Sequence, residues 1–72
     1  MQDWQAIVGK NVRRHRLAKG MTQEQLAFEA EIDLTYLGGI ERGKRNPSLL
    51  VLVRLSAALT VPPRELVSSQ PE

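Results

Sequence analysis

Two short helical segments joined by a two-residue connection constrain this chain more than any other feature of its sequence. The first segment, over residues 22–30, opens with Thr22 and Gln25 at the spacing of a capping box, in which each side chain bonds the other residue's backbone amide. The second segment begins directly after Asp33, a residue type favoured as an N-cap. Only residues 31 and 32 remain between them, so the two helices must meet at a tight junction.

Helical signals continue on both sides of this pair. Apolar side chains recur at helical spacing ahead of the helix-stopping Gly20. The second helix of the pair must stop by Gly43, in a loop rich in helix breakers, after which Ser48 can cap a further helix. Pro62 and Pro63 then favour a last short helix, because proline is tolerated in a first turn. The sequence has no period-two strand pattern, so we expect an all-α fold of five helices, over residues 3–18, 22–30, 34–42, 49–59 and 64–67.

The length of the chain, 72 residues, fits a single domain. A chain this short buries only about 60% of its unfolded surface. It has no cysteine, so compact helical packing or dimerisation must stabilise it, and both a secreted disulfide scaffold and a thiolate metal site are excluded. We expect one domain over residues 1–72, with a core over about 3–67 and a flexible tail over 68–72.

Apolar runs in the sequence are short. The longest, over residues 49–53, has five residues, against roughly 20 needed to span a bilayer. Residues 1–12 are interrupted by polar side chains and lack the apolar core of a signal peptide. We therefore expect a cytoplasmic protein with no membrane partner.

The charge of the chain is arranged in blocks, although its net value is only +2. Residues 1–20 carry five Lys or Arg against one Asp, and residues 42–54 carry four Lys or Arg with no acidic side chain. Between them, residues 21–41 carry five Asp or Glu and no basic side chain. Two basic segments that flank one surface would suit a polyanion. The alternative, ordinary solvated charge on helix surfaces, stays open at this point.

Two short helices joined by so short a turn form a helix-turn-helix, whose second helix enters the major groove of DNA. Around this pair the chain carries four linked motifs: VRRHR at 12–16, GMTQEQLA at 20–27, YLGGIERGKRNPSL at 36–49 and LSAAL at 55–59. On these motifs the sequence resembles the Cro and lambda-repressor-like (Xre-type) helix-turn-helix family over nearly the whole chain, residues 9–67. This resemblance implies a lambda-repressor-like DNA-binding domain and a transcriptional regulator of double-stranded DNA. Compact single-domain members, such as restriction–modification controller proteins, are the most similar branch.

One position departs from the family's pattern. Glu31 stands in the turn where the family usually has glycine. Either a non-glycine residue adopts the special backbone conformation there, or the turn is different.

The face that the second helix of the motif turns to DNA follows from a helical wheel. At about 100° per residue, Tyr36, Leu37 and Ile40 point inward. The outward positions hold no Arg, Asn or Gln, the side chains that make the best bidentate contacts with bases. We expect apolar contacts with thymine methyls and hydrogen bonds to base edges, together with substantial readout of DNA deformability. The candidate groove-facing residues are Asp33, Leu34, Thr35, Gly38 and Gly39.

The two glycines, Gly38 and Gly39, lower the helix propensity of this segment by roughly 1 kcal/mol each relative to alanine. We expect them to permit a close approach of the backbone to DNA. The alternative is that they permit a tight crossing with another helix.

Phosphate contacts are expected at both ends of the motif. The resemblance implies that Gln23, at the start of a helix, binds a phosphate with the help of free amides and the helix dipole, and Thr22 can assist. The hydroxyl of Tyr36 is a further candidate. In the loop after the second helix of the motif, the candidate phosphate contacts are Arg42, Lys44, Arg45 and Asn46. The alternative for this loop is ordinary surface charge.

A structural role is implied by the resemblance for Arg16 and Glu41. In the family, the matching residues form a largely buried ion pair between the first helix and the end of the third. We expect the same pair in this chain.

The expected helix over residues 49–59 has a second apolar side. On its wheel, Leu52, Leu55 and Leu59 point inward. Contiguous apolar surface usually marks an interaction site, so the outward set predicts a homodimer interface that would place two recognition helices roughly 34 Å apart on DNA. The alternative is that these side chains are covered within a monomer. The candidate interface residues are Leu50, Val53, Ala57, Leu66 and Val67.

No motif in the sequence is typical of an enzyme. The single histidine, His15, has no paired nucleophile or second metal-ligating partner at a recognisable spacing, so we expect no catalysis, no cofactor and no metal. The alternative to a regulator that binds DNA by itself is an antitoxin or partner-dependent module. Such a module would bind another protein through the outward strip and have weak DNA affinity alone.

Overall fold

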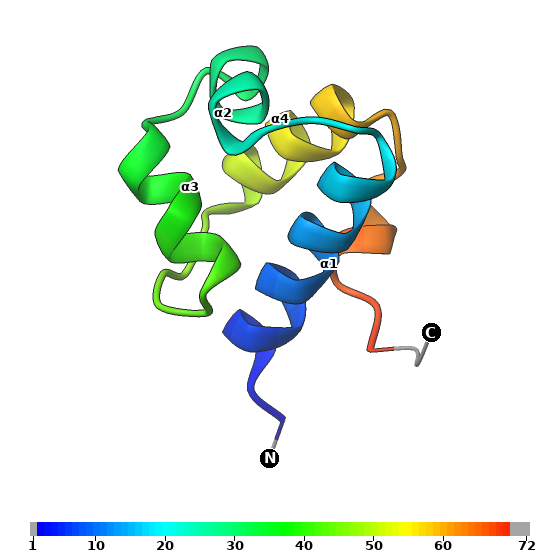
Figure 1. Cartoon of the computed structure of the whole chain (residues 1–72). Helices are drawn as coiled ribbons and strands as arrows, with labels where there is room; N and C mark the ends of the chain where they lie inside the picture. Colours follow the sequence, from blue (N-terminus) through cyan, green and yellow to red (C-terminus); the bar gives the residue numbers. More distant parts are fainter. Residues whose placement is uncertain (1, 70–72) are drawn as a thin grey trace.

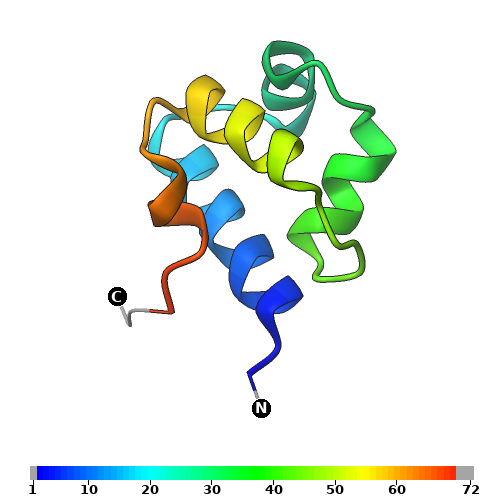
Figure 2. The ribbon, with the colours of Figure 1, turned by 180° about the vertical axis from the view of Figure 1, so that it is seen from behind.

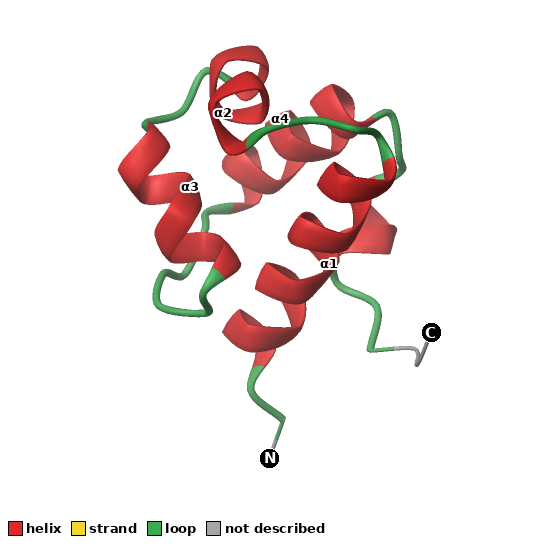
Figure 3. Cartoon of the chain, in the orientation of Figure 1, coloured by secondary structure: helices red, strands yellow, loops and turns green. Residues whose placement is uncertain are grey.

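The computed structural model describes residues 2–69, and within them the chain forms helices and loops only (Figures 1 and 3). The elements in chain order are α1 (Trp4–Ala18), α2 (Gln23–Ala30), α3 (Leu34–Glu41), α4 (Leu49–Leu59) and the 3₁₀ turn η1 (Pro63–Leu66). The four expected long helices are confirmed. None of the described helices has the length and apolar character required to cross a membrane.

The expected fifth helix is wrong in type. Residues 63–66 form one 3₁₀ turn, closed by bonds from the Glu65 amide to the Pro62 carbonyl (2.9 Å) and from the Val67 amide to the Arg64 carbonyl (3.2 Å). A segment of four residues suits the tighter i to i+3 bonding, which closes a turn with fewer residues than an α-helix needs. The fold therefore has four α-helices and a 3₁₀ turn.

Local capping sets where the helices begin. The Thr22 hydroxyl accepts from the Gln25 amide (3.0 Å) and the Gln25 side-chain oxygen accepts from the Thr22 amide (2.8 Å), which confirms the capping box. Asp33 caps α3 by accepting from the Tyr36 amide (3.1 Å), and Ser48 caps α4 in the same way. Each side chain satisfies an amide that has no acceptor within its own helix.

The core lies where α1, α2, α3 and α4 meet, and η1 closes it against α1 and α4 (Figure 2). Leu66 is fully buried there, so the expectation that it lies in an intermolecular interface is wrong. The reason is that the 3₁₀ turn directs its last side chain inward, between α1 and α4. The largest fully buried side chains are Leu26, Leu37, Ile40, Leu55, Leu66 and Val12.

The crossing of α1 and α3 depends on Gly9. A Cβ atom at this position would overlap the carbonyl oxygen of Ile40 and lie 2.9 Å from that of Glu41. Both obstacles are backbone atoms, which cannot rotate away. The absence of a side chain at Gly9 therefore allows α1 to approach the C-terminal end of α3.

The C-terminal segment is held by Asn11, a buried residue of α1. Its side-chain nitrogen donates to the carbonyl of Leu66 (2.9 Å) and to that of Ser68 (2.8 Å). Ser68 is thus anchored, although it falls within the segment expected to be a flexible tail. Residues 70–72 of that expected tail lie outside the described residues.

The turn between α2 and α3 contains Glu31, which stands where the resembled family usually has glycine. This residue adopts the left-handed conformation, with φ 59° and ψ 45°. The Ile32 amide then donates to the Ala27 carbonyl (3.0 Å), a pattern that commonly ends helices. Glu31 therefore takes the backbone conformation that glycine adopts without a steric cost.

Candidate nucleic-acid interface

A buried ion pair fixes the C-terminal end of α3. The Arg16 guanidinium donates to both carboxylate oxygens of Glu41, from Nε to Oε2 at 2.7 Å and from Nη2 to Oε1 at 3.0 Å. The two side chains are only 9% and 3% exposed. A third donor of Arg16 bonds the carbonyl of Met21 (2.8 Å), just ahead of α2. The expected structural pair is confirmed, and it ties α1, α3 and the start of the motif together.

Gln23 joins this ion pair from the first turn of α2. Its side-chain nitrogen donates to Oε1 of Glu41 (3.0 Å), and the residue is half-buried. A phosphate contact from this side chain would have to compete with that bond. The backbone amides of Gln23 and Glu24 begin α2, where a helix provides no acceptor of its own and its dipole favours an anion. At this end of the motif, the free backbone amides of α2 are better placed to bind an anion than the Gln23 side chain is.

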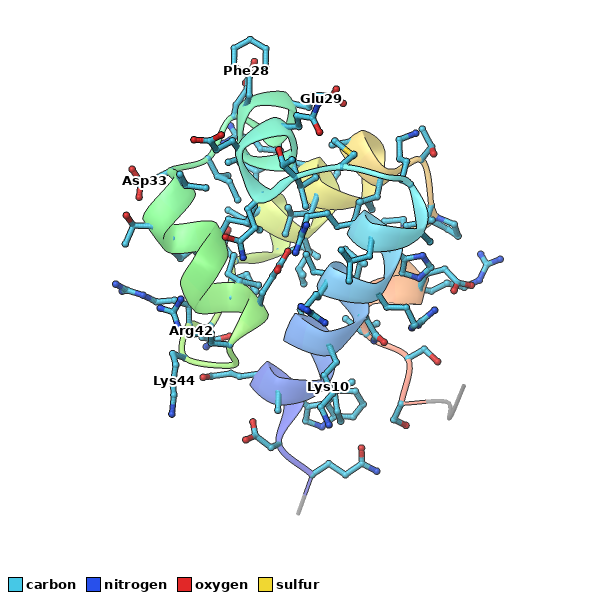
Figure 4. All side chains as sticks on the ribbon, viewed as in Figure 1. Lys10, Phe28, Glu29, Asp33, Arg42 and Lys44 are labelled. Carbon is cyan, nitrogen blue, oxygen red and sulfur yellow. The ribbon has the colours of Figure 1, made fainter. Side chains whose placement is uncertain are left out.

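The N-terminal half of α3 presents an exposed face. Leu34 is 41% exposed, and Asp33 and Thr35 are also exposed (Asp33 is labelled in Figure 4). On the opposite side, Leu37 and Ile40 are fully buried. The wheel's division of α3 into an inward and an outward face is confirmed at these positions. Tyr36, expected inward, is half-buried at the border.

The outward positions in the C-terminal half of α3 are Gly38 and Gly39, and both are buried. A Cβ at Gly38 would lie 3.2 Å from Nη1 of Arg42, and one at Gly39 would lie 2.7 Å from Cγ of Arg45. The atoms nearest to the two Cβ positions belong to the side chains of Arg42, Gln23 and Arg45 and not to the backbone of another helix, which argues against a tight helix crossing at this pair. Arginine side chains cover the bare backbone that was expected to approach DNA.

The loop after α3 is exposed and basic. Gly43 has φ +75° and turns the chain, and a Cβ there would lie 3.1 Å from Cα of Ala6. Figure 4 shows Arg42 and Lys44 at the C-terminal end of α3, away from the core. The exposed side chains of this loop are those of Arg42, Lys44, Arg45 and Asn46.

Helix α4, which lies at the front of Figure 2, carries a separate set of exposed apolar side chains. The inward set of the wheel is confirmed, because Leu55 and Leu59 are buried and Leu52 packs against the core. We call the exposed outward set of Leu49, Leu50, Val53 and Ala57 the α4 strip.

Sequence reasoning missed two large exposed side chains. Leu49 is 75% exposed and lies one turn before Val53, a spacing that was visible in the sequence. Trp4 is 51% exposed, although it shares the helical spacing of the core residues of α1. Val67 is 42% exposed, as its candidate role requires. A pocket of about 340 Å³ meets α4 at Leu52 and is lined by Trp4, Gln5, Val8, Asn46, Pro47, Leu52 and Val67.

Comparison with known proteins identifies the family of this chain. The helix-turn-helix family model HTH_3 matches residues 12–66. The control protein C.BamHI of Bacillus amyloliquefaciens is 47% identical over 62 residues, which cover 85% of this chain and 76% of that protein. The uncharacterized HTH-type transcriptional regulator y4dJ of Sinorhizobium fredii is 40% identical over 70 residues, covering 97% and 91% of the two chains. The crystal structure of the restriction-modification controller protein C.AhdI from Aeromonas hydrophila superposes with a TM-score of 0.84 at 47% identity, covering 86% of this chain and 94% of that one. The chain belongs to the helix-turn-helix family.

Proposed function

We propose that this protein is a sequence-specific regulator of transcription that binds double-stranded DNA as a homodimer, in the manner of a restriction–modification controller. The observation that carries the proposal is the exposed face of α3, which the buried Arg16–Glu41 pair fixes from the inside and a basic loop extends. Relatives are named as control proteins and transcriptional regulators, and none of those described above is named as an enzyme. A regulator of this kind would act in the cytoplasm.

In this proposal α3 lies in the major groove. Leu34 and the methyl group of Thr35 contact thymine methyls, while the Thr35 hydroxyl bonds a base edge. Asp33 spends one carboxylate oxygen on the Tyr36 amide, and its other oxygen remains available to accept from cytosine. The amides at the start of α2 and the basic loop after α3 contact the phosphate backbone on either side.

Dimerisation is supported by the α4 strip. Leu49 and Leu50 are 75% and 59% exposed, which is unusual for two neighbouring leucines on a small domain. Pairing the strips of two copies would remove these side chains from water and present two copies of α3 to successive half-sites. Val67 and Trp4 are also exposed, and they line a pocket together with Leu52 of α4.

Selection of binding sites from a random duplex pool, at a stated near-physiological salt concentration, tests the proposal. The expected result is enrichment of a two-fold symmetric motif whose half-sites are about one helical turn apart, bound by two chains in sedimentation equilibrium. The absence of any enriched sequence would overturn the proposal.

A second candidate function rests on the same apolar surface. If the α4 strip and the pocket at Leu52 bind a different protein, the chain is an antitoxin or a partner-dependent regulator with weak DNA affinity alone. A monomeric chain without an enriched motif is the expected result for this candidate, and tight specific binding by the isolated protein contradicts it.

A further inference from the structure

The outward face of α3 is bare between two polar side chains. Thr35 and Arg42 are seven residues apart, so at about 100° per residue they point in nearly the same direction. The positions between them on this face are Gly38 and Gly39, which supply no side chain. A recognition helix built in this way has an empty strip where other side chains would contact bases.

Two arginines fill this strip from the end of the helix. Arg42 leans toward the helix N-terminus, as helical side chains do, and its Nη1 lies 3.2 Å from where a Cβ of Gly38 would be. The Arg45 side chain returns over Gly39, with its Cγ 2.7 Å and its Nε 3.3 Å from the corresponding Cβ position. Both glycines are buried although they lie on the outward face.

The loop geometry explains how Arg45 reaches back. The Gly43 amide donates to the Ile40 carbonyl (3.0 Å), and the Lys44 amide donates to the Gly39 carbonyl (2.9 Å). These bonds, with the left-handed conformation of Gly43, fold the chain against the last turn of α3. Arg45 is the next residue, so its side chain starts beside the helix instead of beyond its end.

The position of these two guanidinium groups favours contact with a base, because they lie over Gly38 and Gly39 on the outward face of α3. Both arginines are exposed, and within residues 2–69 neither side chain makes a hydrogen bond or an ion pair with the protein. A guanidinium presents a rigid fork of donors, and bidentate bonding to O6 and N7 of guanine is the commonest specific contact in the major groove.

We propose that Arg42 and Arg45 read guanine bases in the major groove, lying across Gly38 and Gly39, and thereby supply the direct readout that the side chains of α3 lack. This inference rests on the proposed function, because it requires α3 to enter the groove. Phosphate contact is then left chiefly to Lys44 and to the start of α2.

Conservative variants separate base reading from phosphate contact. Arg42→Lys and Arg45→Lys keep the positive charge but lose the fork. Each is expected to reduce discrimination at one G·C pair of the half-site by about 5-fold to 150-fold, with the dependence of affinity on salt unchanged. Arg64→Lys, on η1, is the matched control and should leave the selected motif unchanged.

Gly39→Ala provides an independent variant that changes no charge. Its Cβ would push against Cγ of Arg45, so the Arg45 side chain must rotate about χ1 and carry its guanidinium away from Gly39. The expected result is a folded protein, judged by circular dichroism, with reduced discrimination at the same base pair as Arg45→Lys.

Binding-site selection and titrations on single-base variants of the selected site give the readout. An unchanged base preference in both Lys variants, or a loss of affinity that is equal for every sequence, would overturn the inference while leaving the regulator intact. A wild-type protein that enriches no sequence would overturn the proposed function and this inference with it.

Discussion

Removal of Glu41 is expected to cost a large share of the stability of this domain. Its carboxylate accepts three charge-assisted or amide hydrogen bonds, two from Arg16 at 2.7 and 3.0 Å and one from Gln23 at 3.0 Å. In Glu41→Ala the Arg16 side chain, 9% exposed, keeps its charge and only the Met21 carbonyl as a partner. Breaking a buried pair in this way typically costs about 3–5 kcal/mol.

That loss is large for a domain of this size. At about 0.05–0.15 kcal/mol per residue, the whole chain has a free energy of unfolding of about 4–11 kcal/mol. Urea denaturation, followed by circular dichroism, measures the change as a shift of the midpoint at constant slope. Glu29→Ala, an exposed glutamate of α2, is the control and should change stability by less than about 0.5 kcal/mol.

The double variant Arg16→Met/Glu41→Leu completes the test. Because it removes both charges and fills the space with apolar atoms, its stability should be close to that of the wild type. A loss below about 1 kcal/mol in Glu41→Ala, or a double variant as unstable as the single one, would refute the view that the stranded charge of Arg16 is the cause.

Three further changes test other parts of the structure. Gly9→Ala should destabilise the chain by at least about 1–3 kcal/mol in urea denaturation, since its Cβ would overlap the carbonyl of Ile40; a neutral effect would contradict the close crossing. Glu31→Gly should stabilise the chain by up to about 1 kcal/mol in thermal unfolding, because glycine takes the left-handed conformation without steric cost. A destabilised variant would mean that the Glu31 side chain contributes more stability than its backbone strain costs. Leu50→Asp should convert a dimer into a folded monomer in sedimentation equilibrium. Leu50 is 59% exposed, so its burial in both copies contributes about 2–4 kcal/mol to the free energy of dimerisation. An unchanged dimer would place the interface elsewhere.

The helix boundaries were largely predictable because they depend on neighbours in sequence. The caps at Thr22, Asp33 and Ser48 act over three residues, so the side chain and the amide that it satisfies are visible together in the sequence. Helical spacing likewise separated the buried from the exposed side of α3 and of α4. Both rules need only the geometry of a single helix.

The features that sequence reasoning missed depend on contacts between distant segments. Asn11 bonds the Leu66 carbonyl across 55 residues, and no local pattern identifies a buried asparagine of this kind. Gly9 is one of five glycines, and only the position of α3 shows that it permits a helix crossing. Leu66 was placed in the interface because it lies next to the outward strip, but the 3₁₀ turn directs its side chain into the core.

The candidate site depends both on local helical spacing and on contacts between segments that are distant in sequence. The outward positions of α3 were predictable, since they follow from its wheel. Their chemical character was not, because Arg45 reaches the face of the helix only through the fold of the loop at Gly43. The inner face of α3 is fixed by Gly9 and Glu41, and neither residue contributes to the outward surface. Since the contacts that hold the helix are separate from those that face outward, side chains on the outer face can change without disturbing its position. Such a division allows one scaffold to recognise many DNA sequences.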